Sequence, residues 1–205
     1  MFPKVLSAEG WNLLSNLVSS SLLDGWTLCG GTGLALHFGH RISKDLDFSH
    51  TEGFDVDDLV KGISDVSDVH VAGRARNTLH VAVRGTRLSF LRLEAPLLFE
   101  GIAYRGITVA DTRDIAVLIL VAIGGRGSRK DFIDLYYYLK QVPGISNLFD
   151  MLESRSSRID WNKYHLMKSL TYFEDADLEP MPEMLVELDW EEVKTYFKEQ
   201  AKSLL

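Results

Sequence analysis

The chain has 205 residues, of which 46% are hydrophobic and 25% charged, values that suit a globular protein with one core domain or a core domain plus a small helical one. The formal net charge of −7 is unlike that of a dedicated nucleic-acid-binding protein, but residues 160–205 carry 11 acidic and only 5 basic side chains, so the rest is nearly neutral. We expect the acidic part to be a solvated surface or to exclude wrong partners, and it does not forbid a basic cleft elsewhere.

Two further features limit the compartment. Cys29 is the single cysteine, so the chain forms no internal disulfide, and its place in an apolar run indicates a buried, inert thiol. The N-terminus has no signal-peptide pattern, and the most apolar stretch, residues 115–123, is too short to cross a membrane. We therefore expect a cytoplasmic protein without a membrane partner.

The first half predicts short helices and strands. Apolar residues recur at helical spacing over residues 7–19, 32–38 and 54–63. Apolar runs that indicate strands cover residues 26–29, 44–48 and 107–109. Between residues 69 and 93 the pattern is that of strands, with Arg84-Gly85-Thr86 as the turn of a hairpin between residues 77–83 and 87–93.

The second half predicts helices only. Their expected ranges are residues 112–123, 129–141, 146–155, 161–173 and 190–201. The pattern changes from strands to helices near residue 110, so we expect a core domain over residues 1–110 and a helical domain over residues 111–205. The fold class is therefore α+β.

The glycine turn and the Asp-x-Asp strand that follows it carry the strongest chemical signal. Gly30 and Gly31 precede an expected helix that begins at Thr32, and such a turn lets backbone N–H groups approach a phosphate at the helix N-terminus. Asp45 and Asp47 lie two residues apart in an expected strand, so their carboxylates share one face and suit Mg²⁺ or Mn²⁺. This pattern predicts a site for a metal-bound NTP, with a solvated strand end as the alternative.

Several other polar groups have two interpretations. Arg41 either reaches a phosphate or acceptor, or forms a surface salt bridge. His37 and His40 resemble a metal pair, but without a third ligand we expect packing and capping. Basic residues of the hairpin region either guide an RNA backbone or form a solvated surface: Arg74, Arg76, Arg84, Arg87, Arg92 and His80.

Residues 30–37 (GGTGLALH) and 40–48 (HRISKDLDF) resemble the nucleotidyltransferase core of the AbiEii toxin family. Residues 126–136 (RGSRKDFIDLY) resemble the second signature of that family, and residues 164–173 and 190–194 resemble its C-terminal helices. The resemblance covers essentially the whole chain. It implies a polymerase-β-like nucleotidyltransferase fold, with a mixed sheet and flanking helices followed by a helical C-terminal part.

The resemblance also implies a function. Members of this family are expected to transfer a nucleotide from an NTP to an acceptor, with Mg²⁺, in a toxin–antitoxin or phage abortive-infection system. Some relatives attach nucleotides to tRNA ends, which makes RNA the implied acceptor class. The implied genetic partner is a DNA-binding antitoxin that need not contact the toxin.

Specific residues follow from the match. The expected nucleotide-binding residues are Gly30, Gly31, Thr32 and Arg41, and the expected metal ligands are Asp45 and Asp47. The second signature adds Lys130, Asp131 and Asp134 to the two aspartates as catalytic candidates. Asp131 and Asp134 share a helix face at i, i+3, and Lys130 is a point charge suited to a phosphate. The alternative for these three is a charged first turn of a helix.

Two departures from the family pattern bear on activity. Ile119 stands where family members commonly have a lysine, and an isoleucine cannot stabilise a triphosphate. Ser89 stands where related enzymes place a third carboxylate, a role that Asp131 or Asp134 would then take. The rival hypothesis is therefore a degenerate member that binds nucleotide, RNA or a protein without transfer. A sugar-nucleotide transferase is a weaker third reading, because the first hundred residues contain no doubly wound pattern.

Overall fold

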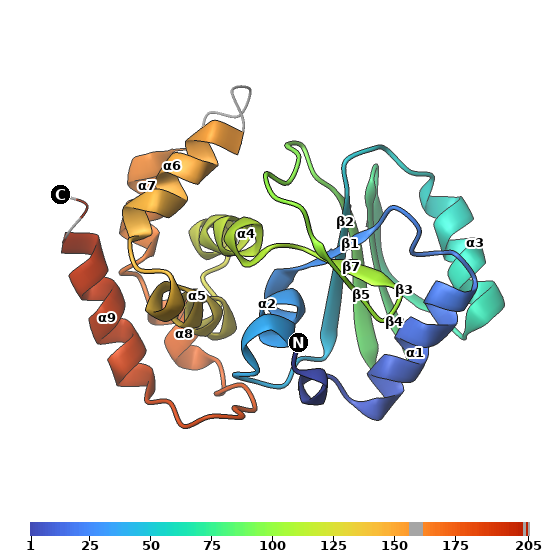
Figure 1. Cartoon of the computed structure of the whole chain (residues 1–205), viewed down its shortest axis with the longest axis horizontal. Helices are drawn as coiled ribbons and strands as arrows, with labels where there is room; N and C mark the ends of the chain where they lie inside the picture. Colours follow the sequence, from blue (N-terminus) through green and yellow to red (C-terminus); the bar gives the residue numbers. More distant parts are fainter. Residues whose placement is uncertain (156–161, 203, 205) are drawn as a thin grey trace.

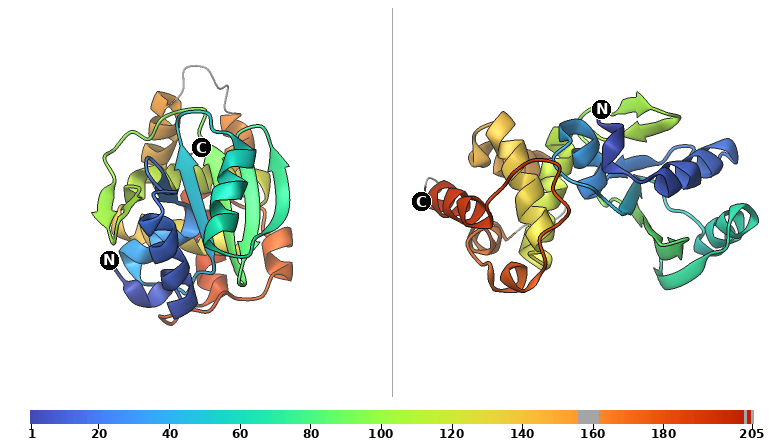
Figure 2. Two further views of the ribbon diagram at one scale, coloured as in Figure 1. Left: turned by 90° about the vertical axis from the view of Figure 1, so that its right-hand side faces the viewer. Right: turned by 90° about the horizontal axis from the view of Figure 1, so that it is seen from below.

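The computed structural model describes residues 1–155, 162–202 and 204, which form a sheet half and a helical half (Figure 1). The sheet half occupies the right of Figure 1, and the helical half, from yellow-green to red, occupies the left. The view from below in Figure 2 shows the same division. In the described part of the chain, no helix combines the length and the apolar character that a membrane span requires.

Among the described residues, seven strands form one mixed sheet, in the order β3-β4-β5-β2-β1-β7-β6. Their bounds are β1 Thr27–Cys29, β2 Asp45–His50, β3 His70–Ala75, β4 Thr78–Val83, β5 Thr86–Arg92, β6 Ile102–Tyr104 and β7 Ile107–Val109. β2 pairs antiparallel with β1 and parallel with β5, while β5, β4 and β3 follow as antiparallel neighbours. β2 is therefore a central strand with a partner on each side.

The helices of the sheet half, within the part of the chain that the structure describes, are the short 3₁₀ helix η1 Pro3–Val5 and the α-helices α1 Ala8–Ser19, α2 Gly30–Phe38 and α3 Val56–Val66. Ser7 caps α1 and Asp55 caps α3, each through a side-chain oxygen that accepts backbone N–H bonds. α1 and α3 cover one face of the sheet, and α2 lies on the other face, between the sheet and the helical half (Figure 1). This arrangement puts the N-terminus of α2 against β2.

The helical half contains α4 Thr112–Gly125, α5 Arg129–Gln141, α6 Ile145–Arg155, α7 Lys163–Ser169, α8 Glu174–Leu178 and α9 Trp190–Lys202. Aromatic side chains fill its core, and Phe132 contacts Phe173, Trp190 and Phe197. α2 packs against both α4 and α5. The two halves therefore meet around α2.

The α+β class and the hairpin expected from the sequence are confirmed, with Arg84 and Gly85 at positive φ between β4 and β5. The strand β6 was missed, although Arg105 and Gly106 form the same kind of turn between β6 and β7. The expected helix over residues 161–173 was too long, because α7 ends at Ser169 and the chain turns to place Phe173 in the core. Trp161 lies outside the described residues.

Candidate functional site

The glycine turn and the two aspartates come together at the junction of β1, α2 and β2. Asp47 pairs with Cys29 across the strands, so Gly30 follows directly beside it. Gly30 has φ +61°, and a Cβ on it would collide with Oδ2 of Asp47. Asp45 and Asp47 alternate with the fully buried Leu46, so both carboxylates lie on the face of β2 opposite to the Leu46 side chain. The sequence spacing predicted this shared face correctly.

Thr32 holds the glycine turn to β2. Its side chain is buried, and its hydroxyl hydrogen-bonds the backbone carbonyl of Asp45 and lies 2.6 Å from the hydroxyl of Ser43. A phosphate at this turn would therefore meet backbone N–H groups, while the Thr32 side chain fixes the turn against the carboxylate strand.

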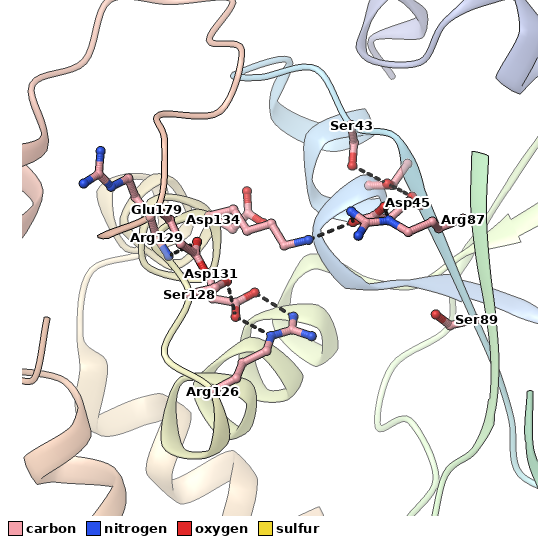
Figure 3. A network of polar contacts seen from close by, with 12 residues as sticks. Ser43, Asp45, Arg87, Ser89, Arg126, Ser128, Arg129, Asp131, Asp134 and Glu179 are labelled. Atoms are coloured by element: carbon pink, nitrogen blue, oxygen red, sulfur yellow. Dashed lines mark hydrogen bonds and ion pairs between the residues drawn. The ribbon is translucent and has the colours of Figure 1, made fainter. Parts of the chain in front are cut away.

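Asp45 lies between two cationic side chains (Figure 3). Arg87 of β5 donates from Nε and Nη2 to its two oxygens at 2.7 and 3.0 Å, and Nζ of Lys130 on α5 lies 2.7 Å from Oδ2. Burial alone would raise the pKa of Asp45, but Lys130 and Arg87 outweigh it and hold the pKa below its ordinary value. The Lys130 contact joins the helical half to the sheet across the site.

Asp47 has a different environment. Burial raises the pKa of its carboxyl, a hydrogen bond from Ser89 opposes that rise, and the nearby charge of Asp45 adds to it. Within the described residues, no cation within ion-pair distance compensates the Asp47 carboxylate, in contrast to Asp45. The site therefore holds a half-buried carboxylate whose ionised form a bound cation would favour.

A pocket of about 360 Å³ opens beside these carboxylates. Its polar lining consists of Asp45, Asp47, His80, Arg87, Ser89, Arg126 and Lys130. Strand register aligns Asp47, Ser89, His80 and Gly73 in one row across β2, β5, β4 and β3. The small residues Ala72 and Ala82 complete the floor, so the sheet face stays open here.

His80 is a site residue whose role the sequence did not assign. Nδ1 of His80 lies 3.2 Å from the hydroxyl of Ser89, and Ser89 in turn lies opposite Asp47 in the strand register. The alternation of β4 was the available signal, since His80 lies on the face opposite the buried Leu79 and Val81. Its partners on the neighbouring strands needed the three-dimensional register.

Arg41 and Asp134 form a buried ion pair between the two halves. Nε and Nη2 of Arg41 donate to the two oxygens of Asp134 at 2.7 and 2.6 Å, and Nε2 of His40 lies 2.7 Å from Oδ1. Complete burial would raise the pKa of Asp134, but Arg41 and His40 outweigh it and leave the pKa lowered. A Cβ on Gly31 would collide with this pair, so the ion pair packs directly against the glycine turn.

Asp131, the remaining candidate of the second signature, lies in the first turn of α5. Asp131 is buried and accepts bonds from Nε and Nη2 of Arg126 at 2.7 and 2.9 Å, and from the Ser128 hydroxyl at 2.8 Å (Figure 3). Arg126 itself lines the pocket, whereas Asp131 and Asp134 lie outside the lining. Both carboxylates are thus engaged in positioning arginines.

The structure also shows what surrounds Ile119 and His37. Ile119 is 3% exposed and belongs to the apolar core of the helical half. Positive charge at the pocket comes from Lys130, Arg126 and Arg87 instead. His37 hydrogen-bonds the carbonyl of Ala110 at 2.9 Å, a packing role like the one expected for it.

The donor set fits a divalent metal bound together with a triphosphate. Asp45 and Asp47 supply oxygen ligands, and no group of three or more His, Cys, Asp or Glu side chains that would hold a metal exists among the described residues. Mg²⁺ commonly takes one or two carboxylates and completes its shell with phosphate oxygens and water. A metal at Asp45 would compete with Arg87 and Lys130 for the carboxylate.

Comparisons with known proteins show what this chain resembles. The model of the family described as "Nucleotidyl transferase AbiEii toxin, Type IV TA system" matches residues 12–85, which include the glycine turn and both aspartates. An uncharacterised protein of Aquifex aeolicus, aq_aa25, is 34% identical over 205 residues, which is 98% of each chain.

Solved structures share the fold at low sequence identity. A protein of H. pylori, provisionally described as a nucleotidyltransferase, has a TM-score of 0.59 at 19% identity, over 97% of this chain and 95% of that one. ANT(2″)-Ia in complex with adenylyl-2″-tobramycin has a TM-score of 0.53 at 12% identity, over 72% and 97%. The nucleotidyltransferase toxin MenT4 of Mycobacterium tuberculosis has a TM-score of 0.50 at 16% identity, over 97% and 87%.

Proposed function

Because this chain belongs to the AbiEii family of nucleotidyltransferase toxins, we propose that it transfers a nucleotide from an NTP to a hydroxyl group of an RNA acceptor. The observation that carries the proposal is the pair Asp45 and Asp47 on one strand face, beside the N-terminus of α2 and under Lys130 of α5. Carboxylates for a metal, backbone donors for phosphates and a cation across the pocket are the parts that phosphoryl transfer requires.

Each group of site residues has a separate role in the proposed reaction. The backbone N–H groups of Gly30 and Gly31, at the start of α2, would donate to phosphate oxygens of the NTP. Lys130 and Arg126 add positive charge from the helical half, where Asp131 holds the guanidinium of Arg126 in place. Asp45 and Asp47 would hold Mg²⁺ or Mn²⁺, and the bound ion would neutralise negative charge on the triphosphate.

The transfer itself forms one bond and breaks one. The acceptor oxygen bonds to the α-phosphorus of the NTP, the bond from that phosphorus to the bridging oxygen breaks, and pyrophosphate leaves. The acceptor hydroxyl loses its proton in this step. We propose that Nε2 of His80 accepts this proton.

The chain Asp47–Ser89–His80 explains this assignment. If the Ser89 hydroxyl donates to Asp47, its oxygen accepts the hydrogen on Nδ1 of His80, and Nε2 then carries the free lone pair. A serine and a histidine on adjacent strands would thereby replace the third carboxylate that we expected at position 89. Asp131 and Asp134, considered for that role from the sequence, are engaged by Arg126 and Arg41.

We further place this activity in the cytoplasm, as the toxin of a toxin–antitoxin or abortive-infection system with a neighbouring antitoxin gene. The family description supports the toxin–antitoxin setting. Expression should then inhibit growth, and Asp45→Asn with Asp47→Asn should relieve the inhibition at equal protein level. Equal toxicity of the double variant would contradict a role for transfer in toxicity.

A binding protein that no longer transfers is the second candidate. The observation behind it is Ile119, which adds no charge to the pocket and lies in the helical core. The presence of Lys130 and Arg126 in the pocket lining favours activity, since cations are supplied from α5 and the turn before it. The third reading, a sugar-nucleotide transferase, loses support because the sheet is mixed rather than doubly wound.

The testing experiment incubates the protein with Mg²⁺, each α-labelled NTP in turn, and total RNA that includes tRNA. We expect label in RNA with at least one NTP, and its loss in Asp45→Asn/Asp47→Asn. Lys130→Ala should reduce the rate by about a hundredfold, the effect of removing one charge-stabilising group. Label in RNA from the double variant at the wild-type rate would refute the site assignment.

A further inference from the structure

Five lysines occur in the acidic C-terminal segment, and the structure divides them into two groups. Lys163 pairs with Glu153 at 3.0 Å, and Lys194 pairs with Asp177 at 3.1 Å and with Glu191 at 2.6 Å. The other three have no carboxylate partner within ion-pair distance among the described residues, and all of them line one pocket: Lys168, Lys198 and Lys202. The unpaired positive charge of this acidic region is therefore gathered in one place.

That pocket is a groove between α7 and α9 with a volume of about 450 Å³. Tyr164 lines this groove and is 64% exposed. Nζ of Lys168 is 4.8 Å from the centre of the Tyr164 ring. Nζ of Lys198 is 5.9 Å from the ring of Phe173. An exposed aromatic face beside unpaired ammonium groups is the combination that binds unpaired bases and their phosphates.

The groove continues toward the candidate active site. A second pocket of about 530 Å³ shares Lys168 and Thr171 with the first, and contains Tyr172 and His165. This second pocket also contains Arg126, which lines the pocket of Asp45 and Asp47 as well. Through these shared lining residues the three pockets form one path from α9 to the carboxylates, with Lys168 and Arg126 along it and Asp175 as an acidic residue of its middle part.

We propose that this path binds the single-stranded end of the RNA acceptor, with its phosphates on Lys168, Lys198 and Lys202 and a base against Tyr164. The inference rests on the proposed function, because the path assigns a place to the acceptor of that reaction. A single strand fits better than a duplex, since bases inside a helix cannot stack on a tyrosine. The path also explains how a protein of net charge −7 binds a polyanion: the binding charge is local.

Binding is measured without NTP, so that it does not depend on transfer. The probe is a fluorescent single-stranded RNA, followed by anisotropy at several salt concentrations, with a duplex of the same sequence beside it. The variant Lys168→Gln/Lys198→Gln/Lys202→Gln should raise the Kd at least tenfold and reduce the slope of log K against log salt by about 2. The matched control is Lys4→Gln/Lys61→Gln/Lys140→Gln, three exposed lysines outside the path, and its Kd should stay within twofold of the wild type.

Tyrosine variants test the stacking part. Tyr164→Leu should weaken binding of the single strand more than of the duplex, and Tyr164→Phe should retain it. Wild-type affinity in the lysine variant, or an equal loss in the control variant, would overturn the inference.

Failure of this inference is distinguishable from failure of the proposed function. RNA bound through the path without label transfer by the wild type would leave the path in place and refute the transfer. Transfer with an unchanged KM for RNA in the lysine variant would refute the path and leave the transfer in place. An acidic peptide that competes for the path better than RNA would also overturn the assignment.

Discussion

Asp47 is the residue on which the account depends most closely. It is a half-buried carboxylate that lies opposite Ser89 in the strand register, and burial and the nearby charge of Asp45 raise its pKa. Its spacing from Asp45 made the shared strand face predictable from the sequence. The difference between the two carboxylates was not predictable, because Arg87 and Lys130 reach Asp45 from positions 42 and 85 residues away.

The raised pKa of Asp47 predicts how metal affinity depends on pH. A metal binds the ionised carboxylate, so affinity for Mn²⁺ should decline as the pH falls through the pKa of Asp47, which lies above the ordinary value of about 3.9. Calorimetric titration with Mn²⁺ between neutral and mildly acidic pH measures this decline. Asp47→Asn should bind at least tenfold more weakly at neutral pH, and wild-type affinity in that variant would exclude Asp47 as a ligand.

His80 and Ser89 give a second prediction at the scale of single residues. His80→Gln should lower kcat by about a hundredfold with little change in the KM for NTP, because it removes the proton acceptor and leaves the phosphate contacts. Ser89→Asp should restore part of the rate in the His80→Gln background, since it supplies a carboxylate beside Asp47. A wild-type rate in His80→Gln would rule out the assigned role.

At the scale of elements, the sequence predicted most helices and strands because their apolar periodicity is clear. It also located the β4–β5 hairpin through its Arg-Gly turn. It missed β6, an edge strand of three residues with two exposed side chains, since so short a segment has no periodicity. The break between α7 and α8 depends on Phe173 packing against Phe132, a contact that periodicity does not reveal.

The position of Ile119 on α4 allows a test of the family expectation at this site. A lysine at position 119 would place an ammonium group in the apolar core of the helical half. Ile119→Lys should therefore cost about 3 kcal/mol or more in the free energy of unfolding and yield no gain in transfer rate. Ile119→Met is the control of similar volume. Denaturant unfolding checks the stability, and a large gain in rate from the lysine would show that position 119 faces the nucleotide.

The pair Arg41–Asp134 links elements that are far apart in the chain. Arg41→Met should cost about 3–5 kcal/mol in unfolding free energy, because it leaves Asp134 buried without its partner. The lowered pKa of Asp134 means that its contribution is present above its unfolded pKa of about 3.9 and is lost as the pH falls through the folded value. Urea unfolding should therefore show the advantage of wild type over Asp134→Asn at pH 7 and its decrease below about pH 4. A constant difference across this range would contradict the assignment.

At the scale of the whole molecule, a sheet half and a helical half meet around α2 (Figure 1). α2 lies between them, Arg41–Asp134 joins them below the glycine turn, and Lys130–Asp45 joins them across the pocket. The family signatures in the sequence predicted that these residues belong to one site. Their pairing required the fold, since a linear pattern does not show which cation reaches which carboxylate. The division into domains at residue 110 stays a prediction.

The most direct test of transfer is a single-turnover reaction with an α-labelled NTP and RNA, in which label in RNA and released pyrophosphate are measured together. Wild-type protein should release one pyrophosphate for each nucleotide incorporated. Asp45→Asn/Asp47→Asn should release none and incorporate none, while its binding of single-stranded RNA persists. If the wild type binds NTP and RNA but produces neither label nor pyrophosphate with any of the four NTPs, the protein is a binding module and the proposed transfer is wrong.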